Sequence, residues 1–463
     1  GAVNAMAPVS TPGAKYTAEF LGTALLMFTV GCNVLSGNKV WGSTSIACSL
    51  MVGIYALGGI SGANFNPAVS FSLFVSKAMG GPGMEAKQAG IYTVVQILAA
   101  VVAAFAYTFL FWDDFNLTPS AGFGWIDAMV CEIVYTFMLC FVVLSMPLAA
   151  NDGPNDFFGL AVGFVMIAGI YGAGAVSGGF FNPAISIGLD FLSLTHGFGW
   201  CAVYAIFQLL GAVLAAAVFK VVRPEDFVRP DDFSRPRRGA LSELMAEFVG
   251  SYLLVLTLGL NVMAKSPAGA FAIGGALASL MYALGAVSGA HFNPAVTMAV
   301  MVSGRELSDA PPKTVLQVFS SMFLQIAGGV LGAMLYTFIY FGGSFRLGPG
   351  SQPANWAVVN FAEFFFTFLL CYVFLCLTVS QTTRSGTVYG LAIGSCLTVG
   401  MNSVGAISGG ALNPAVAIGI AASHRFSEGS LYAAGVYSLT HLVAGVFGAI
   451  VFKATHNGVD SET

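Results

Sequence analysis

The chain has 463 residues, of which 57 % are hydrophobic and only 8 % are charged, with a formal net charge of −4. A soluble domain usually carries about 25 % charged residues, so this composition excludes an ordinary soluble globular protein. The mild net charge gives no indication of a nucleic-acid partner. The 8 cysteines lie in or beside apolar stretches without Cys-x-x-Cys spacing, so we expect no disulfide framework, metal site or cofactor.

The chain contains a series of apolar stretches, each about as long as the roughly 20 residues that a helix needs to cross a bilayer. The first half contains them at 16–36, 43–60, 89–112, 126–147, 157–175 and 199–221. The second half contains them at 243–262, 269–287, 314–340, 359–379, 389–406 and 431–453. The 57 glycines suit helices that approach one another closely in lipid.

One pattern, Gly-x-(Ile/Val)-Ser-Gly-(Ala/Gly)-x-x-Asn-Pro-Ala, occurs four times among these stretches, which indicates an internal repeat. Copies one and three continue Ser-Gly with Ala, whereas copies two and four continue it with Gly. The order A-B-A-B predicts that a unit of two copies was duplicated whole. A glutamate lies 46 to 50 residues before each motif asparagine, near the start of a stretch: Glu19, Glu132, Glu247 and Glu363.

A polar segment that contains Arg-Pro three times divides the two units. We predict an N-terminal tail at 1–14, a first unit at 15–221, a linker at 222–242, a second unit at 243–453 and a C-terminal tail at 454–463. With the linker and both termini in the cytoplasm, 13 of the 17 Lys and Arg residues lie inside and 4 outside, as the positive-inside rule requires. The N-terminal tail fits either a processed transit-peptide stub, and so an organelle membrane, or any disordered tail.

Each motif places polar backbone within apolar sequence, where irregular structure is tolerated only beside protein or a water-filled cavity. The asparagine can cap a helix that begins at the proline. Proline has no N–H, and this costs nothing at the first helical position, where an N–H would have no partner within the helix. The apolar run that follows is too short to cross, so we predict half-helices whose positive dipole ends meet at mid-membrane. The predicted motif residues are Asn66, Pro67, Ala68, Asn182, Pro183, Ala184, Asn293, Pro294, Ala295, Asn413, Pro414 and Ala415.

These motifs, with Ala18-Glu19-Phe20 and its counterparts, resemble the aquaporin (major intrinsic protein) family over nearly the whole chain, twice. The resemblance implies an all-α integral membrane fold of two aquaporin-like bundles, each with six transmembrane helices and two re-entrant half-helices, or twelve spans and four half-helices. It implies single-file water permeation and tetramers with one pore per protomer. It also makes the four glutamates buried structural carboxylates that accept hydrogen bonds from the backbone before each half-helix. Gln96, Gln208, Gln325 and His441 are expected to form helix-packing hydrogen bonds.

The resemblance further implies an aromatic/arginine filter at fixed offsets from the motif asparagines. The arginine, the aromatic residue and the histidine that are usual there in water-selective members are all absent. We expect an apolar and wider filter, which argues against strict water selectivity; low conduction is the alternative, because apolar constrictions also close by dewetting. The filter positions are Ile46, Ile170, Gly179 and Ile185 in the first unit and Ile273, Met401, Gly410 and Val416 in the second.

The favoured function is a passive channel for water and small neutral solutes, with two pores per chain. The alternative is a structural or accessory membrane subunit, within a larger assembly, that keeps the fold and conducts little. An enzyme is not expected, because the sequence has no nucleotide-binding loop, no metal cluster and no nucleophile with a base. A ring of four bundles needs two chains, so we predict a homodimer that imitates the family tetramer.

Overall fold

The computed structural model describes residues 10–146, 156–192, 199–227, 239–305, 313–350, 355–425 and 430–456, which are helical apart from turns and connections. Much of the predicted N-terminal tail, linker and C-terminal tail lies outside the described residues, and α16 continues to His456, into the predicted C-terminal tail. Within the described ranges, 12 helices are long and apolar enough to cross a membrane. Their ends lie within four residues of the apolar stretches in the sequence.

The two units repeat the same order of helices. The first contains α1 (Pro12–Leu35), α2 (Gly42–Ser61), α3 (Pro67–Ala78), α4 (Ala86–Phe111), α5 (Trp125–Ser145), α6 (Phe158–Ser177), α7 (Pro183–Leu192) and α8 (Trp200–Val222), which a 3₁₀ turn follows at Pro224–Phe227. The second contains α9 (Ala240–Met263), α10 (Gly269–Ser288), α11 (Pro294–Ser303), α12 (Val315–Ile339), α13 (Trp356–Thr378), α14 (Tyr389–Ser408), α15 (Pro414–Ser423) and α16 (Ser430–His456).

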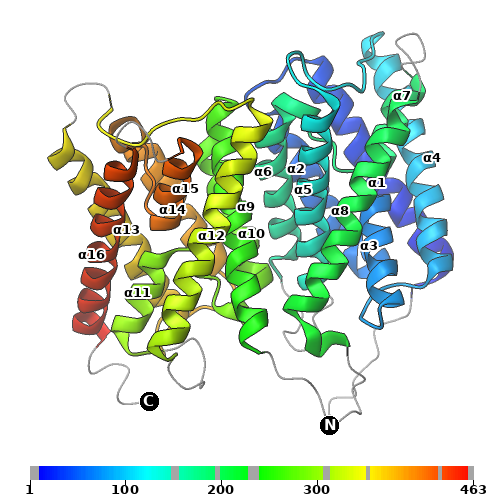
Figure 1. Cartoon of the computed structure of the whole chain (residues 1–463). Helices are drawn as coiled ribbons and strands as arrows, with labels where there is room; N and C mark the ends of the chain where they lie inside the picture. Colours follow the sequence, from blue (N-terminus) through cyan, green and yellow to red (C-terminus); the bar gives the residue numbers. More distant parts are fainter. Residues whose placement is uncertain are drawn as a thin grey trace, which may run out of the picture.

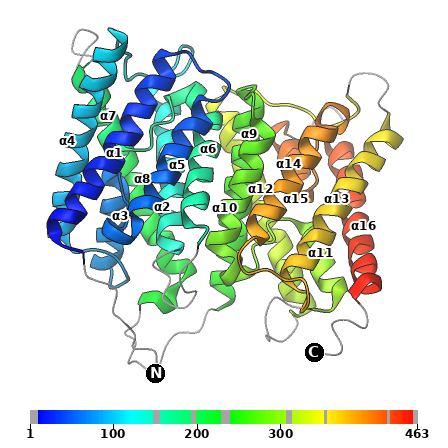
Figure 2. The ribbon, with the colours of Figure 1, turned by 180° about the vertical axis from the view of Figure 1, so that it is seen from behind.

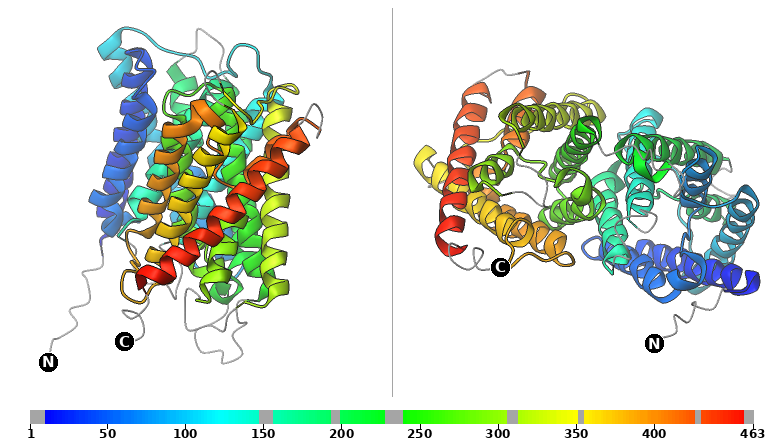
Figure 3. Two further views of the ribbon diagram at one scale, coloured as in Figure 1. Left: turned by 90° about the vertical axis from the view of Figure 1, so that its left-hand side faces the viewer. Right: turned by 90° about the horizontal axis from the view of Figure 1, so that it is seen from below.

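Four of these helices, α3, α7, α11 and α15, have only 10 to 12 residues and enter each bundle half-way. Helices α3 and α11 lie on the side where α1 begins and α16 ends, and α7 and α15 lie on the opposite side (Figures 1 and 2). Seen along the helices, each unit is a ring of helices, and the two rings lie side by side (Figure 3). The predicted fold class, two bundles of six spans and two half-helices each, is confirmed.

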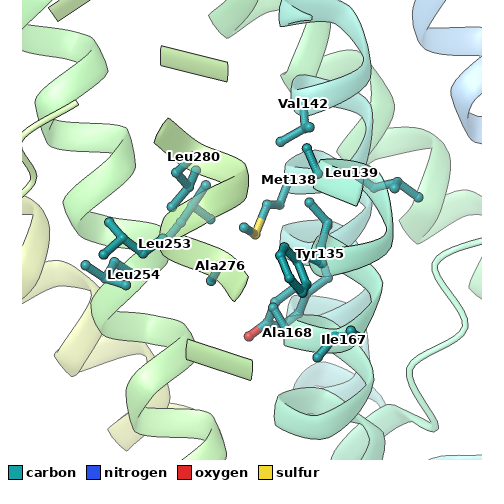
Figure 4. Packing of buried hydrophobic residues seen from close by; sticks show 14 of the residues in the cluster. Tyr135, Met138, Leu139, Val142, Ile167, Ala168, Leu253, Leu254, Ala276 and Leu280 are labelled. Atoms are coloured by element: carbon teal, nitrogen blue, oxygen red, sulfur yellow. The ribbon is translucent and has the colours of Figure 1, made fainter. Parts of the chain in front are cut away.

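The two units join through α5 and α6 of the first and α9 and α10 of the second. Met138 and Val142 of one unit face Leu253 and Leu280 of the other across this interface (Figure 4). Two hydrogen bonds also cross this interface. Ser279 Oγ donates to the carbonyl of Ala161 (2.8 Å), and the hydroxyl of Tyr135 donates to Thr257 Oγ1 (3.1 Å). Buried apolar contact and these two hydrogen bonds therefore join the two units directly, in addition to the covalent linker.

Candidate functional site

The motif asparagines begin the half-helices as caps. In the first unit, Asn66 Oδ1 accepts a hydrogen bond from the N–H of Ala68 (2.8 Å), and Asn182 Oδ1 accepts one from the N–H of Ala184 (2.9 Å). Asn293 and Asn413 do the same in the second unit. Because each cap is followed by proline at the first helical position, the half-helix starts abruptly and its N-terminal dipole end is fixed in place.

The two half-helix tips of each unit are tied to one another. Asn66 Nδ2 donates to the carbonyl of Phe181 (2.8 Å), and Asn182 Nδ2 donates in return to the carbonyl of Phe65 (2.9 Å). The second unit repeats the exchange between Asn293 and Leu412 and between Asn413 and Phe292, both at 2.9 Å. The structure therefore brings residues more than 110 positions apart together within each bundle.

The residue before each motif asparagine has a left-handed backbone, which is costly for a bulky side chain and is found where surroundings impose it. The φ angle is 50° at Phe65, 51° at Phe181, 49° at Phe292 and 51° at Leu412. Its N–H donates to the upstream glutamate at 2.8 Å, and its carbonyl accepts from the opposite asparagine. The strained residue is therefore held at both polar groups. The repeat pattern left this position unassigned, although a large apolar residue in all four copies was a signal.

Each glutamate accepts hydrogen bonds from the loop that leads into its half-helix. Glu19 Oε1 accepts from Ser61 Oγ (2.7 Å) and from the N–H of Asn64 (3.0 Å), while Oε2 accepts from the N–H of Phe65 and from Gln96 Nε2, both at 2.8 Å. The side chain is fully buried. A buried carboxylate is tolerated because its lone pairs are satisfied in this way. Equivalent bonds surround Glu132, Glu247 and Glu363.

A glutamine completes this clamp in three quarters of the molecule and a histidine in the fourth. Gln96, Gln208 and Gln325 each donate both to the glutamate and to a hydroxyl four residues after the motif asparagine, on Ser70, Ser186 and Thr297. In the fourth quarter the hydroxyl position is Ala417, and His441 Nε2 lies 2.8 Å from Glu363 Oε2. The His441 Nδ1 atom is buried without a hydrogen-bond partner. Helix α15 therefore lacks one bond that the other half-helices have.

A narrow cavity lies beside the half-helix tips in each unit. The first is lined by Asn66 and Asn182, and the second by Asn293 and Asn413, with mostly aliphatic side chains around them. Each has a volume of about 20 Å³, little more than the 10–15 Å³ that the centre of one water needs. Each unit thus has its own small, mostly apolar cavity beside two amide groups.

The filter positions differ in their relation to these cavities. Ile273 and Val416 line the second cavity, whereas the other six positions do not line either cavity. Gly179 and Gly410 have φ angles of 71° and 62°, and a Cβ there would lie 3.2 Å from Ile170 Cα and 3.1 Å from Met401 Cα. Each glycine therefore permits its loop to touch α6 or α14. The structure brings Gly179 against Ile170 and Gly410 against Met401.

The sequence model of the family described as "Major intrinsic protein" matches residues 9–200, 151–263 and 237–452. The chain belongs to the major intrinsic protein family. Among relatives, the "Probable aquaporin NIP-type" of Nicotiana alata is 31 % identical over 46 % of this chain and 78 % of its own length. The "Glycerol uptake facilitator protein-like 6" of Lactiplantibacillus plantarum is 33 % identical over 46 % of this chain and 99 % of its own length.

A solved structure, the aquaglyceroporin of Plasmodium falciparum, matches 46 % of this chain and 98 % of its own with 23 % identity and a TM-score of 0.40. Family membership confirms the resemblance seen in the motifs. The protein is a multi-pass integral membrane protein of a family of passive channels, which also confirms that it is not an enzyme.

Proposed function

We propose that the chain forms two pores, one per unit, that carry water and small neutral solutes. The observation that carries this proposal is the reciprocal bonding of Asn66 with Phe181 and of Asn182 with Phe65, repeated in the second unit, beside a cavity in each. An asparagine amide has two N–H groups, and the bond across the tips uses one of them. The second N–H is then the donor that a permeating molecule meets in an otherwise apolar path.

The half-helix ends supply the electrostatics of these pores. Four positive dipole ends, each about half an elementary charge, point at the two paths and repel cations. The apolar filter positions add no fixed charge in either unit, because Ile185 and Val416 occupy the place of the usual arginine. Selection against cations then rests on the half-helices, and selection by size rests on aliphatic side chains.

The test is permeation through the purified protein in liposomes, with stopped-flow measurement of water, glycerol and urea fluxes. Val162 and Ile393 line equivalent points of the two cavities and are both buried. The double change Val162→Trp, Ile393→Trp should abolish flux, whereas Leu331→Trp on the exposed face of α12 should not. A wild-type chain that passes neither water nor glycerol nor urea would overturn the proposal.

An accessory subunit with little conduction is the second candidate, and the narrow aliphatic cavities favour it. A constriction of about 20 Å³ with few polar groups is prone to dewetting. Under this alternative, wild type and the double tryptophan variant would give the same flux, equal to that of empty liposomes.

We further propose that the units span 15–221 and 243–453, with the linker at 222–242 and both termini in the cytoplasm, and that two chains close a ring of four bundles. The interface inside the chain is heterologous, because it joins α5 and α6 of one unit to α9 and α10 of the other. In these helices 78 % to 83 % of an 18-residue apolar stretch is buried. The equivalent helices α1, α2, α13 and α14 reach only 28 % to 44 %, which leaves one copy of each interface face for a second chain.

One contact of the interface inside the chain provides a test for a second copy of it. Inside the chain, a Cβ on Gly275 would lie 3.1 Å from the ring of Phe164, so a small residue faces a large one. The equivalent positions on the outer faces are Cys48 and Ser395, both exposed. Ser395→Cys should therefore form a disulfide with Cys48 of a second chain, and Ser395→Cys with Cys48→Ser should not. A mass that stays at one chain under oxidation would contradict the dimer.

A further inference from the structure

The two pores of the chain differ at three equivalent positions on the side where α3 and α11 enter, which we call the inner end. Two residues before the motif asparagine stands Asn64 in the first unit and His291 in the second. Eleven residues after the glutamate stand Val143 and Phe374, and all four residues line the cavities. Twelve residues before the clamp glutamine the second unit has Lys313 in place of Met84.

In the second unit, two of these residues form a wall of the cavity. The rings of His291 and Phe374 meet edge to face, with centroids 5.4 Å apart and an interplanar angle of 85°. His291 Nδ1 lies 3.1 Å from Thr297 Oγ1, which fixes the ring. Its Nε2 atom is buried without a hydrogen-bond partner, and the residue is only 5 % exposed. A buried polar atom that borders a cavity is a binding group for a molecule that passes.

The lysine holds a positive charge next to this wall. Lys313 Nζ donates to the carbonyl of Ser288 (3.1 Å) and lies 3.3 Å from Glu243, and its side chain is 18 % exposed. Lys313 and Arg305 line a second cavity of about 40 Å³, and His291 borders both cavities. The cavity beside the imidazole therefore adjoins one that is lined by Lys313, which pairs with Glu243, and by Arg305.

The first unit has neither the imidazole nor the cation at its inner end, and the aromatic side chain that lines its cavity there is Phe158, at the start of α6. Asn64 Nδ2 donates to Ser70 Oγ (3.0 Å) and lies 3.9 Å from the sulfur of Met84, so its side-chain donor is engaged within the protein. Val143 leaves less bulk than a phenyl ring at the same point of the wall. The two cavities have the same volume of about 20 Å³, so the pores differ at this end in the polarity and charge of the lining and in the place of the aromatic ring.

We propose that His291, Phe374 and Lys313 form an inner selectivity constriction in the second pore alone. This inference rests on the proposed function and deepens it. An aromatic ring, an imidazole and a cation are the three groups that the outer filter lacks, and the second pore brings them together at the opposite end. The second pore then passes water but holds back organic solutes and cations, whereas the first pore also passes small neutral organic solutes.

The experiment measures one pore at a time. Val162→Trp plugs the first pore and leaves the second, and Ile393→Trp does the reverse, because the two residues line equivalent points. In liposomes, the ratio of glycerol to water flux should be about tenfold lower for the Val162→Trp chain than for the Ile393→Trp chain, the discrimination that about one methylene of difference in a pocket supplies.

The constriction is then replaced by its first-unit counterpart. In the Val162→Trp chain, His291→Asn with Phe374→Val and Lys313→Met should raise the glycerol-to-water ratio to that of the first pore. Lys313→Met alone should raise permeation of methylammonium more than that of glycerol, because it removes a charge and little bulk. The control is Leu331→Val on the exposed face of α12. It also replaces a second-unit residue by its first-unit counterpart, which is Val102 on α4.

Equal flux ratios for the two singly plugged chains would overturn the inner constriction and leave the proposed channel function intact. If neither the two singly plugged chains nor the wild type carried any flux, the inner constriction and the proposed channel function would both be overturned. A second measurement needs no plug: Phe374→Val in the otherwise unchanged chain should raise the glycerol-to-water ratio, and an unchanged ratio would contradict the inference.

Discussion

The residue before each motif asparagine connects the two halves of a unit. Phe65, for example, gives its N–H to Glu19 and its carbonyl to Asn182, and so joins α1 to the half-helix that enters from the other side. The strained backbone at this point is maintained because both polar groups have fixed partners. A change that moves the phenyl ring should therefore disturb the tip-to-tip contact as well as local packing.

Glycine 22 tests this dependence. A Cβ at Gly22 would lie 2.1 Å from Cε1 of Phe65, so Gly22→Ala must displace the ring. We expect a loss of about 1–3 kcal/mol of stability, as for other overpacked sites, and a lower water flux. Gly13→Ala is the matched control on the same helix, because nothing lies within 4 Å of its Cβ position. Thermal unfolding in detergent measures both, and equal midpoints would contradict the prediction.

The filter positions allow a second test at this scale. Ile185→Arg with Val416→Arg would return a positive charge to the place of the family arginine in both pores. We expect flux of glycerol and urea to fall more than flux of water, because a long side chain narrows the path and favours small polar molecules. Ile185→Leu with Val416→Leu controls for repacking at these buried sites. Equal losses for all solutes would place the constriction elsewhere.

Single residues were predictable from the sequence only where the repeat marked them. Four copies of one motif single out the asparagines and the glutamates in the sequence. The contact of His291 with Phe374 was not predictable, because it joins positions 83 residues apart through the packing of α13 beside α11. The positive φ of Phe65 was hidden for a related reason: phenylalanine carries no local preference for that backbone.

At the scale of the helix, apolar length predicted the twelve spans, and a capping residue extends α1 beyond its apolar stretch. Helix α1 begins at Pro12, four residues before the apolar stretch, because Thr11 Oγ1 accepts from the N–H of Ala14 and proline follows at the first position. Hydropathy does not register such a cap. The four half-helices were predictable because proline after asparagine marks a helix start inside apolar sequence.

Helix α15 is the half-helix with an incomplete clamp. The other three quarters of the molecule show which residues would complete it, a glutamine and a hydroxyl. Ala417→Ser with His441→Gln would recreate the bonds that Gln208 makes to Glu132 and Ser186. We expect a gain of about 0.5–1.5 kcal/mol, the usual worth of one hydrogen bond. Each single change should give less than half of the stability gained by the double change, because neither change alone completes the bonds. A double-mutant cycle in thermal unfolding measures this coupling. Additive effects would contradict the clamp as described.

For the whole molecule, the interface between the units should hold without the covalent connection. Two halves expressed separately, and divided within 228–238, should still copurify, because α5 and α6 pack against α9 and α10 over buried apolar side chains. Tyr135→Ala combined with Ser279→Val removes the two polar contacts across it and should weaken copurification. Tyr204→Phe, which removes a hydroxyl within the first unit only, is the control. Separation of the unmodified halves would contradict the prediction.

The directional contact between unlike units has a consequence for gene dosage. If two such chains close a ring, each unit has an unlike unit on both sides, so the pores alternate around the ring and their numbers stay equal. Separate genes for the two units would instead produce a mixture of rings that depends on expression levels. A substitution that blocks one pore and leaves the chain folded then silences half of the pores in every ring, and the other kind of permeability remains.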